Sequence, residues 1–198
     1  MSSHAKLSPS AADRWLRCPG SVPLSEGMPQ RTSAFSEEGT LAHEIAEKIL
    51  NGWEPEGVDE TMLENVRIYT DYVQTLAVGN KLHVETRVKC FPDLWGTADA
   101  VVWVPRLFQL HVIDLKYGAG VPVEVANNFQ LKIYGLASLK TFGMAAQTVT
   151  TTIVQPRCPH PDGPVRSFTY DTIDLIEFNA DLEDAIKTVQ EAVNAYED

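Results

Sequence analysis

The chain has 198 residues, enough for one domain with a sizeable core, and its 44% hydrophobic and 22% charged residues are ordinary for a globular protein. It has no apolar run long enough to span a membrane, and its polar start lacks a signal-peptide core, so we expect a cytoplasmic location. Three cysteines, Cys18, Cys90 and Cys158, lack the number and spacing of a disulfide framework and are expected to be reduced.

The net charge of −11 argues against a generally basic nucleic-acid binder. Residues 36–80 and 161–198 each hold ten acidic and two basic residues, which could form solvated helix faces. The other segments are mildly basic. A DNA-contacting surface built from them therefore remains compatible with the charge.

The first half of the chain predicts a loop-rich arm followed by two amphipathic helices. The arm, residues 1–35, contains one short helix (AADRWL) whose Trp15 and Leu16 would attach it to the body. Ser36 is a candidate N-cap for a helix that ends near Gly52. A second helix is expected from residue 61 to about residue 79.

The second half predicts a sheet. Alternating residues indicate strands near 81–90, 97–104 and 109–116, a helix over 124–142, a fourth strand over 147–156, then an edge strand and a C-terminal helix. We expect a single domain over 1–198, with an arm (1–35), a core (36–156) and a C-terminal strand and helix (157–198).

The third strand ends in an acid and a lysine. Because strand side chains alternate between faces, Asp114 and Lys116 lie on the same face as Val112. A carboxylate that holds a divalent cation, beside a lysine that orients or activates water, is what a metal-dependent phosphodiester hydrolase needs. The alternative is a salt-bridged pair at a strand end.

Two further residues have a functional and a structural interpretation. Asp99 is an acid within an apolar strand, which requires a cation, a metal or a set of hydrogen bonds, unless solvent near the turn reaches it. His43 borders the apolar stripe of the first long helix, where a histidine is more often a satisfied core residue than a metal ligand.

Five motifs in order are similar to the RecB-like branch of the PD-(D/E)XK nuclease superfamily. They are GTLAH ending at His43, Glu85, GTAD ending at Asp99, IDLK over 113–116, and Gln130 with Tyr134 one helical turn later. The opening SPSAADRWLRCPGS further resembles phage-encoded members. The resemblance implies an α/β restriction-endonuclease-like core, a mixed sheet flanked by helices in the order αβββαβ.

The resemblance also implies roles for individual residues. His43, Asp99, Asp114 and the Leu115 carbonyl would bind the metal, and Lys116 would activate the water. Glu85 would assist at the metal or at a second cation, while Gln130 and Tyr134 would position Lys116 and the phosphate. Oxygen ligands with one imidazole suit Mg²⁺ or Mn²⁺.

We therefore expect a DNA exonuclease that leaves 5′-phosphates, in phage recombination or end processing in the host cytoplasm, with a single-strand annealing protein and a homo-oligomer as candidate partners. One alternative is a structure-specific endonuclease or a CRISPR-adaptation-like nuclease. Another is a non-catalytic acidic binding protein, such as a DNA mimic, on a nuclease fold.

Some relatives of this family bind an iron–sulfur cluster through four cysteines. Three scattered cysteines cannot supply four ligands, so we expect no such cluster. Cys18 is expected to be a small buried hydrophobic residue, and Cys90 is placed on a central strand.

Overall fold

A computed structural model describes residues 6–28, 33–143 and 145–197 of the chain. These residues form a five-stranded mixed sheet in the order β1-β2-β3-β4-β5. The strands are β1 (Lys81–Phe91), β2 (Leu94–Val104), β3 (Gln109–Leu115), β4 (Thr148–Val154) and β5 (Val165–Asp171). Neighbouring strands are antiparallel except β3 and β4, which are parallel and joined through helix α5 (Phe129–Phe142). The expected mixed α/β architecture is therefore confirmed.

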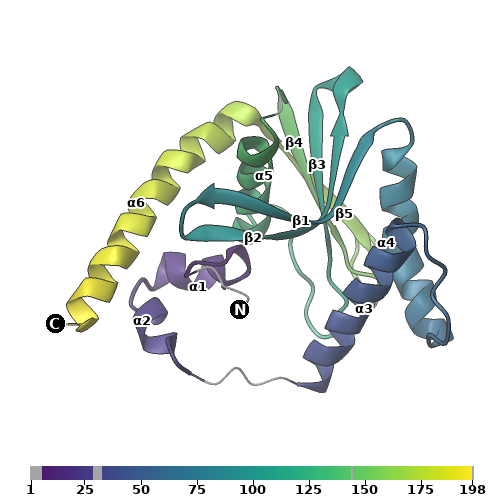
Figure 1. Ribbon diagram of the computed structural model, residues 1–198, viewed down its shortest axis with the longest axis horizontal. Coiled ribbons are helices and arrows are strands. Elements are labelled where there is room, and N and C mark those ends of the chain that lie inside the picture. The colour runs from purple at the N-terminus through teal and green to yellow at the C-terminus, as the bar shows by residue number, and fades with distance from the viewer. Residues whose placement is uncertain (1–5, 29–32, 144, 198) are drawn as a thin grey trace.

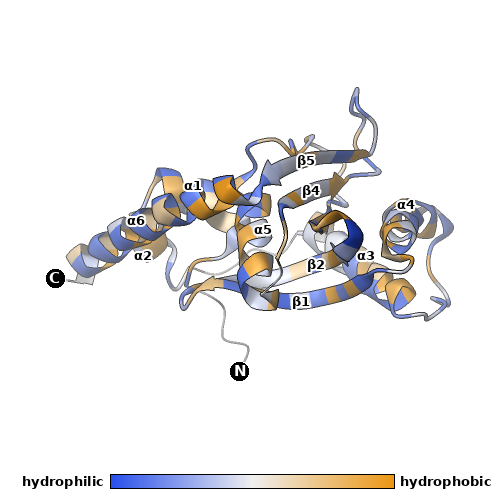
Figure 2. Ribbon diagram, turned by 90° about the horizontal axis from the view of Figure 1, so that it is seen from above, coloured by the Kyte–Doolittle hydropathy of each residue, from blue (hydrophilic) through white to orange (hydrophobic). Residues whose placement is uncertain are grey.

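Helices cover both faces of this sheet (Figures 1 and 2). Two long helices, α3 (Ala34–Leu50) and α4 (Glu60–Ala77), lie side by side on one face. The opposite face carries α5 and the C-terminal helix α6 (Thr172–Glu197), with the short arm helices α1 (Ala12–Arg17) and α2 (Ser21–Ser25) beside them. Two single 3₁₀ turns complete the described elements, η1 (Pro9–Ala11) and η2 (Pro105–Leu107).

The core is divided by the sheet into two clusters. Beneath α3 and α4, Ile45, Val66 and Tyr69 pack with Ile113 and Leu115 of β3. On the other face, Leu110 and Val112 of β3 pack with residues of α5 and α6 and with Trp15 of the arm. The alternation predicted for the third strand is confirmed, and it directs Asp114 to the α5 side, the side of Val112.

The side-chain alternation of the β1–β2 hairpin reverses near Glu85. Leu82 packs under α3 and α4, whereas Val88, which lies on the same predicted face, belongs to the opposite cluster. In β2 the same change separates Ala98 from Ala100. Glu85 has a backbone φ of +43°, in the left-handed region that residues other than glycine rarely adopt. The uniform faces predicted for β1 and β2 are therefore wrong across this position.

Several predicted boundaries also shift. Helix α5 begins at Phe129 rather than at residue 124, because Asn128 accepts a hydrogen bond from the Leu131 N–H and so caps the helix there. Helix α3 is capped by Ser33 rather than Ser36. Cys90 lies on β1, which is an edge strand and not a central one.

The arm is attached to the body as expected. Trp15 is 1% exposed and donates a hydrogen bond from its indole N–H to the Ser8 carbonyl at 3.0 Å. Leu7 forms an isolated bridge with Leu94 at the end of the hairpin. Throughout the described residues, every helix is too short or too polar to cross a membrane.

Candidate metal centre and the adjoining lysine

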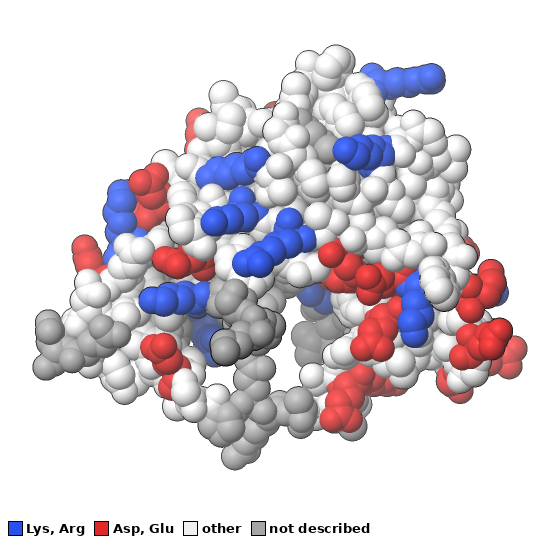
Figure 3. All heavy atoms as spheres, in the orientation of Figure 1, with Lys and Arg blue, Asp and Glu red and all other residues white. Residues whose placement is uncertain are grey.

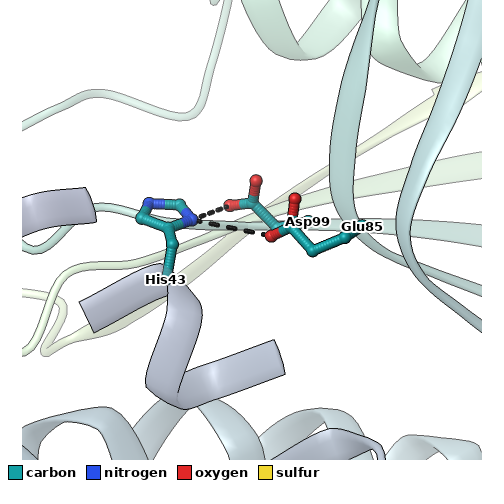
Figure 4. Close-up of side chains that lie close together, drawn as sticks. All are labelled: His43, Glu85 and Asp99. Atoms are coloured by element: carbon teal, nitrogen blue, oxygen red, sulfur yellow. Dashed lines mark ion pairs between the residues drawn. The ribbon is translucent and has the colours of Figure 1, made fainter. Parts of the chain in front are cut away.

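His43, Glu85 and Asp99 come together from three elements, α3, β1 and β2 (Figure 4). The imidazole Nδ1 of His43 lies 3.8 Å from Oε1 of Glu85 and 3.6 Å from Oδ2 of Asp99. One ligand atom from each residue lies within 4.8 Å of the others. Atoms that share one divalent cation are separated by about 3–5 Å, so this trio has the spacing of a metal centre.

The fold brings the trio together in two ways. Helix α3 packs against α4 and the sheet through Ala42, Ile45 and Ala46, and this packing directs the neighbouring His43 toward the hairpin. The unusual backbone of Glu85 falls where the hairpin changes its side-chain alternation. Strained backbone of this kind costs about 1–3 kcal/mol and concentrates at functional sites.

A hydrogen bond joins the trio to the end of β3. The Leu115 N–H donates to Oδ2 of Asp99 at 2.8 Å. Ala100 lies opposite Ile113 in the antiparallel register, so the next residues along the two strands are Asp99 and Asp114. The two aspartates therefore occupy adjacent positions at the same end of the sheet.

Asp114 and Lys116 belong to a second polar cluster that includes the side chain of Gln130 on α5. Lys116 Nζ lies 2.9 Å from Oδ2 of Asp114 and donates to Oδ1 at 3.3 Å. It also donates to Oε1 of Gln130 at 3.2 Å, and the Gln130 amide donates to Oδ1 of Asp114 at 3.0 Å. The acid, lysine and glutamine thus fix one another's orientation.

The electrostatics of the site reflect carboxylates crowded at low solvent exposure. Burial, and then the neighbouring charge of Asp114, raise the pKa of Asp99 to about 7. Burial by itself lowers the pKa of His43, but its interaction with Glu85 and the charges of Asp99 and Asp114 outweigh that effect and raise it to about 9. The raised pKa values of Asp99 and His43 both indicate a concentration of negative charge, which a divalent cation would neutralise.

Lys116 is affected by the same carboxylates. Burial by itself lowers its pKa, yet the charge of Asp114 and the hydrogen bond to that group raise it above the ordinary value for lysine. At neutral pH the Lys116 side chain is therefore a protonated hydrogen-bond donor. It can orient a water molecule or stabilise negative charge on a phosphate oxygen.

Tyr134 lies at the edge of this arrangement. Burial raises its pKa, with additional contributions from the charges of Asp114, Asp99 and Glu85. Its ring packs so closely against Gly96 that a Cβ at that position would lie 2.9 Å from the Tyr134 hydroxyl. Glycine in the GTAD segment is therefore required by close packing.

The donor set fits an oxygen-preferring divalent cation. His43, Glu85 and Asp99 could hold it directly, and Asp114 adds a carboxylate at the adjacent strand position. A ligand set of carboxylate oxygens with one imidazole suits Mg²⁺ or Mn²⁺. This set contains none of the thiolates that are typical of structural zinc sites. The contribution of the Leu115 carbonyl remains a prediction, since the contact the structure gives this backbone unit toward the trio is through its N–H.

A buried polar network beside the site was not predicted from the sequence. Arg166 is 5% exposed and donates to the carbonyls of Gly163 and Val123 and to Oε1 of Gln155. The Gln155 amide donates to the carbonyls of Gly118 and Val121. Together they hold the loop that follows Lys116. The sequence feature that could have identified Gln155 is a glutamine directly after a buried, β-branched strand. No local sequence pattern distinguishes Arg166.

The prediction that Cys18 is buried is wrong. It is exposed, whereas Cys90 and Cys158 are buried. The C-terminal end of the short helix α1 leaves the thiol at the surface rather than in the core. The expected absence of an iron–sulfur cluster remains a prediction.

A family model and two solved structures are similar to this chain. A family model described as "Protein of unknown function (DUF2800)" matches residues 4–193. The structure of a protein assigned as an exonuclease from Eubacterium rectale aligns with a TM-score of 0.54 and 8% identity over 95% of this chain and 81% of that one. An alkaline exonuclease from Laribacter hongkongensis aligns with a TM-score of 0.44 and 10% identity over 96% of this chain and 91% of that one. The first of these two alignments shows a shared fold.

Proposed function

The chain belongs to the DUF2800 family of proteins of unknown function, and we propose that it is a metal-dependent deoxyribonuclease. The observation that carries this proposal is the joined arrangement of His43, Glu85 and Asp99 with Asp114 and Lys116. A compact set of carboxylates with one imidazole and one lysine, at the ends of adjacent strands, is suited to hydrolysis of phosphodiesters. The shared fold with a protein assigned as an exonuclease supports the same class of activity.

Each residue has a distinct role in this proposal. When bound, Mg²⁺ or Mn²⁺ would neutralise charge on the scissile phosphate and lower the pKa of a coordinated water. Asp99 and Asp114, with His43 and Glu85, would hold the cation. Lys116 would orient the attacking water and donate a hydrogen bond to the phosphate.

Gln130 and Tyr134 would act by positioning. Gln130 bonds both Lys116 and Asp114, so it fixes the direction in which the ammonium points. Tyr134, one helical turn after Gln130, packs against Gly96 and would position the phosphate from that side. Removing Gln130 would misplace the acid and the lysine without removing a metal ligand.

The finer assignment extends the proposal to a RecB-like PD-(D/E)XK exonuclease that acts on linear DNA ends, leaves 5′-phosphates and serves phage recombination or end processing. The order of the motifs supports this assignment. A non-catalytic DNA mimic is less consistent with the site, because a mimic has no use for a lysine held between a carboxylate and a glutamine.

Digestion of end-labelled DNA tests the proposal. Linear and circular substrates, single- and double-stranded, would be incubated with Mg²⁺ or Mn²⁺, with a chelator as the control. We expect metal-dependent cleavage of linear DNA and little cleavage of circles. Cleavage of both would indicate an endonuclease, and no cleavage of any substrate with either metal would refute the nuclease assignment.

A further inference from the structure

A cavity of about 660 Å³ lies between the N-terminal arm and the end of the β1–β2 hairpin. Its volume is within the range of pockets that bind small ligands, about 300–1,000 Å³. Lys6 and Arg14 of the arm contribute two positive charges to its wall against the one carboxylate of Glu26, while Trp95 and Tyr134 contribute aromatic surface. Figure 3 shows acidic side chains gathered over α3 and α4, whereas most of the basic side chains on this face lie toward the hairpin and the arm.

The cavity adjoins the candidate metal centre. Tyr134 lines it, and Gln130, one helical turn earlier on α5, is hydrogen-bonded to Asp114 and Lys116. Thr97, also in the wall, lies two residues before Asp99 on β2. A nucleotide next to a phosphate held at the metal centre could therefore reach the cavity along the edge of Tyr134.

Trp95 is held in place by a cation–π contact. The guanidinium of Arg87 lies 3.5 Å from the centre of its ring. Arg87 is not part of the cavity wall, so the indole presents a different part of its surface to the cavity. The Trp95 side chain is only partly buried, which leaves it accessible to a ligand.

Aromatic rings beside basic side chains are the features with which proteins bind single-stranded nucleic acid. A base within a duplex must leave the stack before it can enter such a pocket, which costs a few kcal/mol. An already unpaired base avoids that cost. The lining therefore favours an unpaired nucleotide over duplex DNA.

We propose that this cavity binds one unpaired nucleotide of the DNA strand whose phosphate lies at the metal centre, with its base packed against Trp95. The preferred substrate is then single-stranded DNA or the frayed end of a duplex. Lys6 and Arg14 supply sequence-independent attraction to the backbone. This inference rests on the proposed nuclease function.

Two assays on the full chain separate the cavity from the chemistry. Binding of a fluorescent single-stranded dT oligonucleotide would be followed by anisotropy with a chelator present, so that the bound strand stays intact. Hydrolysis of bis(p-nitrophenyl) phosphate with Mn²⁺ would report on the metal centre, because that small diester does not need the cavity. Thermal melting would establish that each variant is folded.

Trp95→Ala is expected to weaken oligonucleotide binding about 5- to 150-fold, the effect of losing one stacked base. The rate on bis(p-nitrophenyl) phosphate should change less than about twofold. Trp53→Ala is the matched control, since Trp53 is 72% exposed and lies outside the cavity wall. It should bind the oligonucleotide as the unaltered chain does.

Arg14→Gln provides a second probe in case Trp95→Ala does not fold. Arg14 lines the cavity, whereas Arg17 on the same helix is paired with Asp13 and does not. Arg14→Gln should reduce the salt dependence of binding, and Arg17→Gln should not. Binding unchanged by both cavity variants, or a preference for blunt duplex that is independent of Trp95, would overturn the inference.

Failure of the nuclease assignment would look different. In that case neither DNA nor the small diester would be hydrolysed by any form of the protein. Loss of oligonucleotide binding in Trp95→Ala would then still identify the cavity as a nucleotide site.

Discussion

The metal centre, formed by residues of α3, β1 and β2, and the loop-anchoring network, which contains Gln155 after β4, differ in how their polar groups are partnered. In the metal-centre cluster, His43, Glu85 and Asp99 are partly exposed and crowd negative charge that has no full set of partners. In the loop-anchoring network, Gln155 and Arg166 are buried and bonded to backbone carbonyls on several sides. The first arrangement suits binding of an added cation, and the second suits structural support.

A backbone hydrogen bond joins the loop-anchoring network to Lys116, which belongs to the cluster of Asp114, Lys116 and Gln130 beside the metal centre. The Lys116 N–H donates to the carbonyl of Val154, the residue before Gln155, at 2.9 Å. Through this bond between strand ends, the network that holds residues 118–123 also limits where the Lys116 side chain can move. Variants in the two clusters should therefore separate loss of function from loss of stability.

The largest expected effect belongs to Lys116. Lys116→Ala should lower DNA cleavage about 10²- to 10³-fold, the usual effect of removing a positioned hydrogen-bond donor that stabilises developing negative charge. Metal affinity should persist or rise slightly, because the change removes a cation and no ligand. Nuclease rates and a calorimetric metal titration would measure both effects.

Lys187→Ala is the matched control, since Lys187 also pairs with carboxylates but lies exposed on α6. It should leave cleavage unchanged. A destabilised but active Lys116→Ala protein would reduce Lys116 to a structural partner of Asp114.

Asp99→Asn should abolish the stabilisation by metal. In the unaltered chain, Mn²⁺ at one hundred times its dissociation constant should add about 2.7 kcal/mol to the free energy of unfolding. The variant should lose most of this increment, seen as a smaller metal-induced rise in Tm. A full metal-induced rise would exclude Asp99 as a ligand.

Without metal, Asp99→Asn should have the opposite effect on stability, and this effect should depend on pH. The pKa of Asp99 is raised from 3.8 to about 7, so the folded state binds this proton more tightly than the unfolded state does. Its ionisation destabilises the fold as the pH rises from about 4 to 7. Without metal, Asp99→Asn should therefore melt higher than the unaltered chain at pH 8, and this advantage should disappear near pH 4.

The loop-anchoring network should respond in stability. Gln155→Leu removes one of the three acceptors of the Arg166 guanidinium, and it takes the amide donor away from the carbonyls of Gly118 and Val121. We therefore expect a loss of about 1–3 kcal/mol in the free energy of unfolding. Metal affinity should be nearly unchanged. Chemical denaturation and metal titration of one preparation would measure both quantities. A large loss of metal affinity with little loss of stability would instead place Gln155 in the metal centre.

The smallest effect concerns the backbone of Glu85. Glycine tolerates positive φ, so the relief of strain in Glu85→Gly should at least offset the usual cost of glycine in a strand, about 0.5–1 kcal/mol. Lys89→Gly, also on β1, should incur that cost in full. Equal losses of stability in the two variants would argue against strain at Glu85.

The sequence alone determined the order of the long helices and the strands, and it identified the candidate site residues. Alternation placed Asp114 on the face of Val112, and this is confirmed, because side-chain direction within one regular strand follows from local geometry. The same rule was wrong across Glu85, where a left-handed backbone conformation reverses the faces of the hairpin. Nothing local in the sequence indicates that conformation.

Only the tertiary structure decided which of these residues meet. The approach of His43 to Asp99 depends on how α3 packs against α4 and the sheet, and the burial of Arg166 depends on a loop more than forty residues away in sequence, at Val123. The cavity beside Trp95 exists because the arm returns to the hairpin through Leu7 and Trp15. Distances of this kind result from the packing of segments far apart in the chain, which periodicity and motif spacing do not specify.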